Sequence, residues 1–217
     1  MLEAFTAGLL LITVSELGDK TFFIAVILAM RYSRWLVFLA VLTALALMTV
    51  ISVLFGQVVS LLPTIYIRYG EIALFLGFGG KLIYDGLQMQ NQPPDAEVAE
   101  ATEIVEQSLA QPFIDRGKLL SFWHSPIIKL FSQGFVMTFL AEWGDRTQIA
   151  TIGLAAAKNP WGVTLGAICG HAICTVIAVL GGRFIAGKIS EKSITLLGGG
   201  LFLIFGGVAI ADLGKIS

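Results

Sequence analysis

Long apolar runs are the feature that most constrains how this chain can fold. A bilayer-spanning helix needs about 20 mostly apolar residues, and six runs are long enough: 4–30, 35–61, 69–89, 129–157, 160–186 and 193–212. Hydrophobic residues make up 56% of the 217 residues and charged residues only 13%, whereas about a quarter of a typical soluble domain is charged. The sequence therefore predicts an all-α, polytopic membrane protein with six transmembrane helices.

The sequence also matches itself when it is shifted by 126 residues, which places residue 16 on residue 142. SELGDKT at 15–21 then aligns with AEWGDRT at 141–147, and TVISVLFG at 49–56 aligns with TVIAVLGG at 175–182. Self-similarity over this length indicates a duplicated structural unit.

Each copy contains three predicted helices, and an odd number makes the two copies enter the membrane from opposite sides. Such inverted-topology repeats are frequent in secondary transporters, which bind substrate near the bilayer midplane. We predict a first three-helix repeat at 1–89, an acidic linker at 90–128 and an inverted second repeat at 129–217.

Basic residues predict the orientation of the chain. The loops after the first, third and fifth predicted helices carry most of them: Arg31, Arg34, Arg116, Lys118, Lys129, Lys188 and Lys192. The opposite face has Arg68, Lys158 and Lys215. The positive-inside rule then places the linker in the cytoplasm and both termini outside or in a lumen. Within the linker, apolar residues at helical spacing among glutamates predict a short acidic helix, either a solvated connector or a cation-attracting or regulatory element.

The repeated motif places charges in the middle of predicted membrane spans. In a continuous helix, Glu16, Asp19 and Lys20 share one face, because they are three and four residues apart. The second copy repeats this spacing with Glu142, Asp145 and Arg146. A charge at the bilayer centre costs several kcal/mol, so these side chains should face a partner or a watery cavity.

The charge of the combined motifs indicates the chemistry. Four carboxylates and two bases leave a formal charge of −2, which matches one divalent cation or two protons. Carboxylate and hydroxyl oxygens are hard ligands suited to Ca²⁺, Mg²⁺ and Mn²⁺, and the Cys/His set typical of zinc is absent from the motifs. The predicted metal ligands are Glu16, Asp19, Glu142, Asp145, Thr21 and Thr147, with Lys20 and Arg146 balancing the charge.

Crowded carboxylates repel one another, which favours proton uptake and therefore exchange of a cation for protons. The alternative is a buried ion-pair network that only holds the two halves together. Two symmetry-related motifs with excess acid favour the transport site.

Other polar positions give weaker signals. Ser15 and Gln148 are possible accessory ligands, and Gly18 and Gly144 permit close helix approach or a local break in the helix. We expect Asp85 and Asp212 to be solvated caps at helix ends. For His171 we favour a hydrogen bond between helices over a proton relay.

The doubled Glu-x-Gly-Asp-(Lys/Arg)-(Thr/Ser) signature resembles that of the Gdt-type family of Ca²⁺/Mn²⁺:H⁺ exchangers, and the resemblance covers nearly the whole chain. It implies transport of Mn²⁺ or Ca²⁺ as the bound ligand and no other cofactor. The compact length is most similar to cyanobacterial members. That implies export of Mn²⁺ from the cytoplasm across a thylakoid or plasma membrane.

Two other functions compete with this prediction. An exporter of lysine or another organic cation would need a larger pocket with a site for a carboxylate group. An intramembrane aspartyl protease would need two Asp residues with matched acid and base roles, whereas a base follows each motif Asp. We therefore predict a transporter and not an enzyme. The net charge of −1 and the absence of a basic run indicate no nucleic-acid partner, and the oligomeric state is left open.

Overall fold

A computed structural model describes residues 1–89, 95–110, 125–185 and 191–214. All regular structure in these ranges is helical. The helices are α1 (Leu2–Glu16), α2 (Lys20–Arg31), α3 (Arg34–Val59), α4 (Thr64–Gln88), α5 (Asp95–Ala110), α6 (Pro126–Ala141), α7 (Arg146–Ala157), α8 (Pro160–Ile185) and α9 (Glu191–Leu213). The basic residues Arg116, Lys118, Lys188 and Lys215, used for the predicted orientation, lie outside the described ranges.

The two motif-bearing spans predicted at 4–30 and 129–157 are broken helices, and the breaks fall at the glycines for which a local break was one of the two possibilities. Gly18 has φ of 79° and Gly144 has φ of 81°. This left-handed conformation is incompatible with a continuing α-helix, and it costs a residue other than glycine about 1–2 kcal/mol. Asp19 and Asp145 then serve as the N-caps of α2 and α7. The motif residues therefore lie around a break and do not share one helix face.

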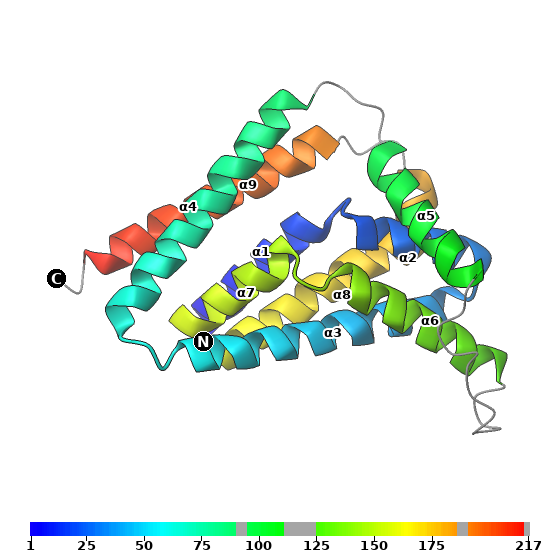
Figure 1. Ribbon diagram of the computed structural model, residues 1–217, viewed down its shortest axis with the longest axis horizontal. Helices are drawn as coiled ribbons and strands as arrows, with labels where there is room; N and C mark the ends of the chain where they lie inside the picture. Colours follow the sequence, from blue (N-terminus) through cyan, green and yellow to red (C-terminus); the bar gives the residue numbers. More distant parts are fainter. Residues whose placement is uncertain (90–94, 111–124, 186–190, 215–217) are drawn as a thin grey trace.

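Helices that correspond under the 126-residue shift have exchanged packing partners. α1 packs on α8 as α6 packs on α3; α2 packs on α8 as α7 packs on α3; and α4 and α9 pack on each other. Figure 1 shows the α4–α9 pair along one side, α3 and α8 along the other, and α1 and α7 between them. The core of the bundle is thus made by helices from both halves of the sequence.

Small residues bring α1 and α8 close together. A Cβ atom added to Gly166 would clash with the backbone carbonyl oxygen of Phe5, and one added to Gly162 would lie 2.6 Å from the carbonyl oxygen of Met1. Close backbone approach through glycine is typical of helix packing inside membranes. This contact fixes the position of α1, and therefore of Glu16 at its end.

The described helices have the length and apolarity of a membrane protein. Arg34–Val59, Pro160–Gly181 and Lys192–Leu213 are each long and apolar enough to cross a bilayer, and Pro126–Ala141 is a shorter apolar helix. The breaks shorten the first and fourth predicted spans, and α4 carries Arg68, Glu71, Lys81 and Asp85. Three of the six predicted spans therefore meet this criterion as single helices.

The acidic linker forms the predicted helix, but this helix is not a solvated connector. Ala101 and Val105 on α5 are fully buried, and they join the apolar cluster around Phe22 and Phe23 of α2. The glutamates at 100, 103 and 106 face solvent, and Glu106 pairs with Arg31 at the end of α2. The α5 helix is therefore part of the packed body (Figure 1).

Ion pairs connect α1, α7 and α9 at the end of the bundle where α1 begins. The Lys158 ammonium, just after α7, contacts the Glu3 carboxylate and lies 3.9 Å from Oδ2 of Asp212. Asp212 therefore has a charged partner, which corrects its prediction as a solvated helix cap. In α4, Arg68 pairs with the buried Glu71 at 3.2 Å.

Candidate metal centre

Three carboxylates from the two motifs converge between the helix breaks. Oxygen atoms of Glu16, Glu142 and Asp145 all lie within 4.8 Å of one another. Glu16 ends α1, Glu142 follows α6 and Asp145 begins α7. Glu16 is 3% exposed and Glu142 is 2% exposed. Such a buried cluster of like charges is unfavourable without a bound cation or protons.

The motif threonines lie against these carboxylates. The Thr21 hydroxyl donates to Oε2 of Glu16 at 3.4 Å, and the Thr147 hydroxyl is 3.0 Å from both carboxylate oxygens of Asp145. Both threonines are buried. The structure therefore gathers five of the six predicted ligands, Glu16, Glu142, Asp145, Thr21 and Thr147.

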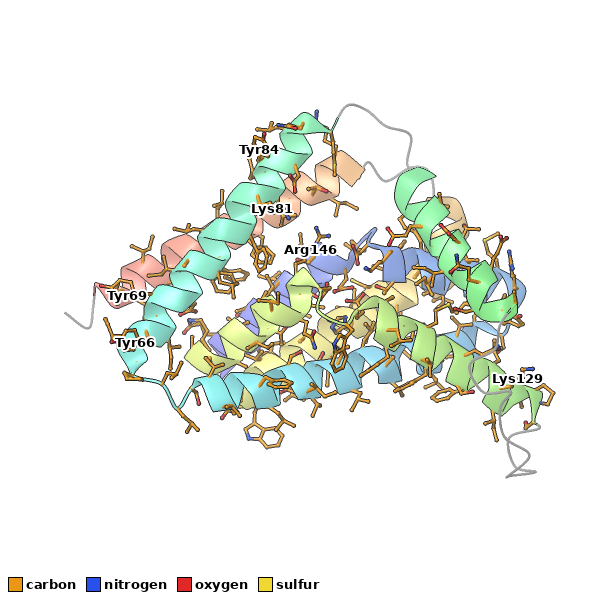
Figure 2. All side chains as sticks on the ribbon, viewed as in Figure 1. Tyr66, Tyr69, Lys81, Tyr84, Lys129 and Arg146 are labelled. Carbon is orange, nitrogen blue, oxygen red and sulfur yellow. The ribbon has the colours of Figure 1, made fainter. Side chains whose placement is uncertain are left out.

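Asp19, the remaining predicted ligand, lies apart from the three-carboxylate cluster. Its Oδ1 atom accepts a hydrogen bond of 3.3 Å from Nη2 of Arg146, which belongs to the other motif. Figure 2 shows Arg146 at the start of α7, beside the break between α1 and α2. Lys20, the counterpart of Arg146, makes no ion pair among the described residues. Of the two bases predicted to balance the charge, Arg146 is the one with an ion pair among the described residues.

Two small cavities flank the cluster, each with room for one water-sized species, about 10 Å³. Glu16 lines one cavity and Glu142 with Asp145 lines the other, while Leu45 and His171 line both. Under the 126-residue shift these cavities are counterparts. A larger cavity of about 80 Å³ reaches Asp19 from between α4 and α9.

Several buried polar atoms at the centre lack a hydrogen-bond partner among the described residues. They are Oε1 of Glu16, Oε1 of Glu142, the hydroxyl oxygen of Ser15 and Nδ1 of His171. Buried polar atoms are ordinarily satisfied, so each such exception needs a physical explanation. Two unsatisfied carboxylate oxygens beside small cavities fit the donor set of a hard cation.

Nδ1 of His171 has no hydrogen-bond partner among the described residues, so this atom does not make the predicted contact between helices. Asp85, predicted as a solvated cap, lies in the last turn of α4 and is partly exposed. It lines the larger cavity together with Ser15, Gly18 and Asp19. Ser15 thus faces this cavity and not the three-carboxylate cluster.

Gln148 has a structural partner in this conformation. Its Oε1 atom accepts a hydrogen bond of 2.7 Å from the backbone N–H of Gly144, and its backbone N–H donates to Asp145 at 2.7 Å. Both contacts hold the second helix break in shape. The oxygen predicted as an extra metal ligand is therefore occupied by the backbone.

Sequence reasoning did not identify the polar wall of the Glu142 cavity, formed by Thr49, Ser52 and Thr151. The available signal was the asymmetry between the repeats. The 126-residue shift pairs Thr151 with Ala25 and Ser52 with Ala178. Positions where the copies differ in polarity mark where the two cavities differ.

An acidic cluster enclosed by apolar helices is the arrangement typical of ion and proton pathways in membrane transporters. The family model for the divalent cation/proton antiporter GDT1 matches residues 4–90 and 130–215. The chain belongs to the GDT1 family of divalent cation/proton antiporters.

Its relatives include cyanobacterial and chloroplast proteins. A GDT1-like protein of Synechocystis is 54% identical over 206 residues, which cover 94% of this chain and 95% of that protein. GDT1-like protein 2, chloroplastic, of rice is 44% identical over 217 residues, covering 94% of this chain and 59% of the relative. The chloroplastic PAM71 homologue of Arabidopsis is 44% identical over 211 residues, with 94% and 58% covered. No solved structure matches the chain.

The family assignment decides among the functions considered from the sequence. Members are cation/proton antiporters, so the chain is a transporter and not an enzyme. Membership of this family does not favour the lysine exporter or the intramembrane protease.

Proposed function

We propose that this protein exchanges a divalent cation, Mn²⁺ or Ca²⁺, for protons and exports the cation from the cytoplasm. The observation that carries the proposal is the buried cluster of Glu16, Glu142 and Asp145, within 4.8 Å of one another. Carboxylate oxygens suit Mn²⁺ and Ca²⁺. They are also the groups that accept protons when the metal leaves.

The proposed architecture is six membrane spans in two inverted repeats, with α1–α2 and α6–α7 as broken spans. Discontinuous helices that meet at a repeat interface are typical binding sites in secondary transporters. The exchange of packing partners between α1–α8 and α6–α3 supports this arrangement. The breaks then lie near the bilayer midplane, where the carboxylates are shielded from lipid by protein.

The charge of the site gives a reason for obligatory exchange. With all four motif carboxylates and both bases ionised, the site carries −2. One divalent cation neutralises it, and so do two protons. An empty, ionised site is expensive to enclose in a low-dielectric interior. The carrier should therefore change conformation only when loaded, with two protons moving against each metal ion.

Flux into proteoliposomes tests this mechanism. Purified protein is reconstituted, a pH gradient is imposed, and uptake of Mn²⁺ and Ca²⁺ is followed together with a pH-sensitive dye. We expect metal uptake to dissipate the pH gradient in proportion. Metal flux that leaves the pH gradient unchanged would contradict the exchange mechanism.

Cysteine labelling tests the proposed orientation. Glu103 on α5 is exposed and is replaced by cysteine after Cys169 and Cys174 have been changed to alanine. A membrane-impermeant reagent should not label the Glu103→Cys variant in intact cells. It should label this variant after the membrane has been opened. Labelling of intact cells would reverse the assignment of linker and termini.

A further inference from the structure

His171 has a position that the Glu-x-Gly-Asp motifs do not explain. It lies in α8, is 5% exposed, and is one of two histidines in the chain. It lines the Glu16 cavity and the Glu142 cavity, and its Nδ1 atom makes no hydrogen bond among the described residues. A buried, unpartnered imidazole nitrogen is unfavourable unless a ligand uses it. Neutral imidazole is a common metal ligand.

The two cavities differ in polarity although the repeat relates them. Phe22 and Ala25 line the Glu16 cavity where Gln148 and Thr151 line the Glu142 cavity. A cation leaving water is therefore better accommodated beside Glu142 than beside Glu16. His171 is the nitrogen-bearing side chain of this polar cavity that remains without a partner.

Hydroxyl groups in the Glu142 cavity have lone pairs available. The Thr49 hydroxyl donates its proton to the Leu45 carbonyl at 2.9 Å, and the Ser52 hydroxyl donates to the Met48 carbonyl at 2.8 Å. With their protons engaged, both oxygens present only acceptor lone pairs to a neighbour. Oε1 of Glu142 also lacks a hydrogen bond. The cavity therefore combines oxygen acceptors with one free imidazole nitrogen.

We propose that the Glu142 cavity is a second cation position beside the three-carboxylate cluster, and that the imidazole of His171 selects a transition-metal ion such as Mn²⁺ over Ca²⁺. This inference rests on the proposed exchange function and adds the class of ion. Ca²⁺ takes six to eight oxygen ligands, so a nitrogen in the shell disfavours it. Imidazole is a preferred ligand of Zn²⁺, Cu²⁺, Fe²⁺ and Ni²⁺, and Mn²⁺, as a first-row transition-metal ion, accepts a nitrogen ligand more readily than Ca²⁺ does. His171 is not part of the 4.8 Å cluster, which separates its position from that of the carboxylate centre.

Competitive flux tests the selectivity. Proteoliposomes with wild type or His171→Leu, which installs the residue found at the counterpart position 45, receive Mn²⁺ and Ca²⁺ together under one pH gradient. We expect the Mn²⁺:Ca²⁺ flux ratio to fall roughly tenfold, the size of change seen when groups around a metal site are removed. His124→Gln, at the other histidine of the chain, is the matched control, and its ratio should equal that of wild type.

Pulsed electron paramagnetic resonance of Mn²⁺ bound to detergent-solubilised protein gives a readout independent of transport. We expect modulation from an imidazole ¹⁴N nucleus in wild type and in His124→Gln, and its loss in both His171→Leu and His171→Gln. The glutamine variant keeps a polar side chain of similar size in case leucine impairs folding.

An unchanged flux ratio in His171→Leu, or absence of nitrogen modulation in wild type, overturns the selectivity role and leaves the exchange function standing. A wild-type protein that moves neither ion against protons overturns both.

Discussion

The two copies of the motif have nearly the same sequence but different contacts. In the second copy, Asp145 turns toward its own helix and accepts hydrogen bonds from the Thr147 hydroxyl and the Gln148 backbone. In the first copy, Asp19 does not cap α2 with its side chain and pairs with Arg146 across the repeat interface. A symmetric sequence thus builds a site with three clustered carboxylates and one separate ion pair. The copies should respond differently to the same substitution.

The largest effect should come from the three clustered carboxylates. Glu16→Gln, Glu142→Gln and Asp145→Asn should each reduce metal flux to background, because a divalent ion would then leave uncompensated positive charge in the enclosed site. These nearly isosteric changes should preserve folding, measured by size-exclusion chromatography in detergent. Glu103→Gln removes the same charge from the exposed face of α5 and should keep wild-type flux. Normal flux in all three variants would return the motifs to a structural role.

Asp19 should show a smaller loss that a second substitution partly reverses. Asp19→Asn leaves the Arg146 guanidinium unpaired beside the cluster, where it repels an incoming cation, and flux should fall about tenfold. The double variant Asp19→Asn/Arg146→Gln removes the stranded charge and should transport faster than Asp19→Asn alone. If the double variant is no faster, the ion pair has no part in placing the cation.

The helix breaks should be sensitive to the left-handed backbone conformation alone. No atom lies within 4 Å of a Cβ added at Gly144, so Gly144→Ala tests strain without a steric clash. It should lower the free energy of unfolding by about 1–2 kcal/mol, measured as a loss of thermal stability in detergent. Gly144→Asn should cost less, because asparagine tolerates this conformation better. If the alanine variant is as stable as wild type, the backbone at position 144 must be able to leave the left-handed conformation without loss of stability.

The smallest effect is expected at Lys20. Since Lys20 makes no ion pair among the described residues whereas Arg146 does, Lys20→Gln should change flux by less than about threefold, in keeping with the small contribution of weakly paired charges. Arg146→Gln is the matched comparison and should be the more damaging change. A Lys20 variant as impaired as the Arg146 variant would show that the copies contribute equally.

The sequence predicted that the two motifs would lie close together, because the 126-residue shift and the helical apolar runs are both properties of the chain pattern. It allowed a break at Gly18 and Gly144 but did not require one, since the left-handed conformation is a property of the folded backbone. The choice of Asp19 as the partner of Arg146 depends on side-chain distances across helices from different halves. No sequence spacing encodes those distances.

His171 and α5 illustrate the other limit of the sequence. An isolated histidine in an apolar helix is compatible with a hydrogen bond or with a free nitrogen, and only the neighbouring helices decide between them. The apolar face of α5 was visible in its helical spacing. Its glutamates predicted a helix exposed to solvent. In the structure, Ala101 and Val105 pack against α2, and nothing in the sequence indicated that α2 lies next to this helix.

Docking of α5 on α2 turns a set of acidic residues into a surface potential with a fixed position. Three exposed glutamates, at 100, 103 and 106, are held on one packed helix, whereas on a free tether their average field would spread over a large volume. Screening limits such a field to about 8 Å at physiological ionic strength. Divalent ions accumulate in a negative potential more steeply than monovalent ions, because the Boltzmann exponent doubles with the charge. Any enrichment of divalent ions at this face should therefore fall as salt is added.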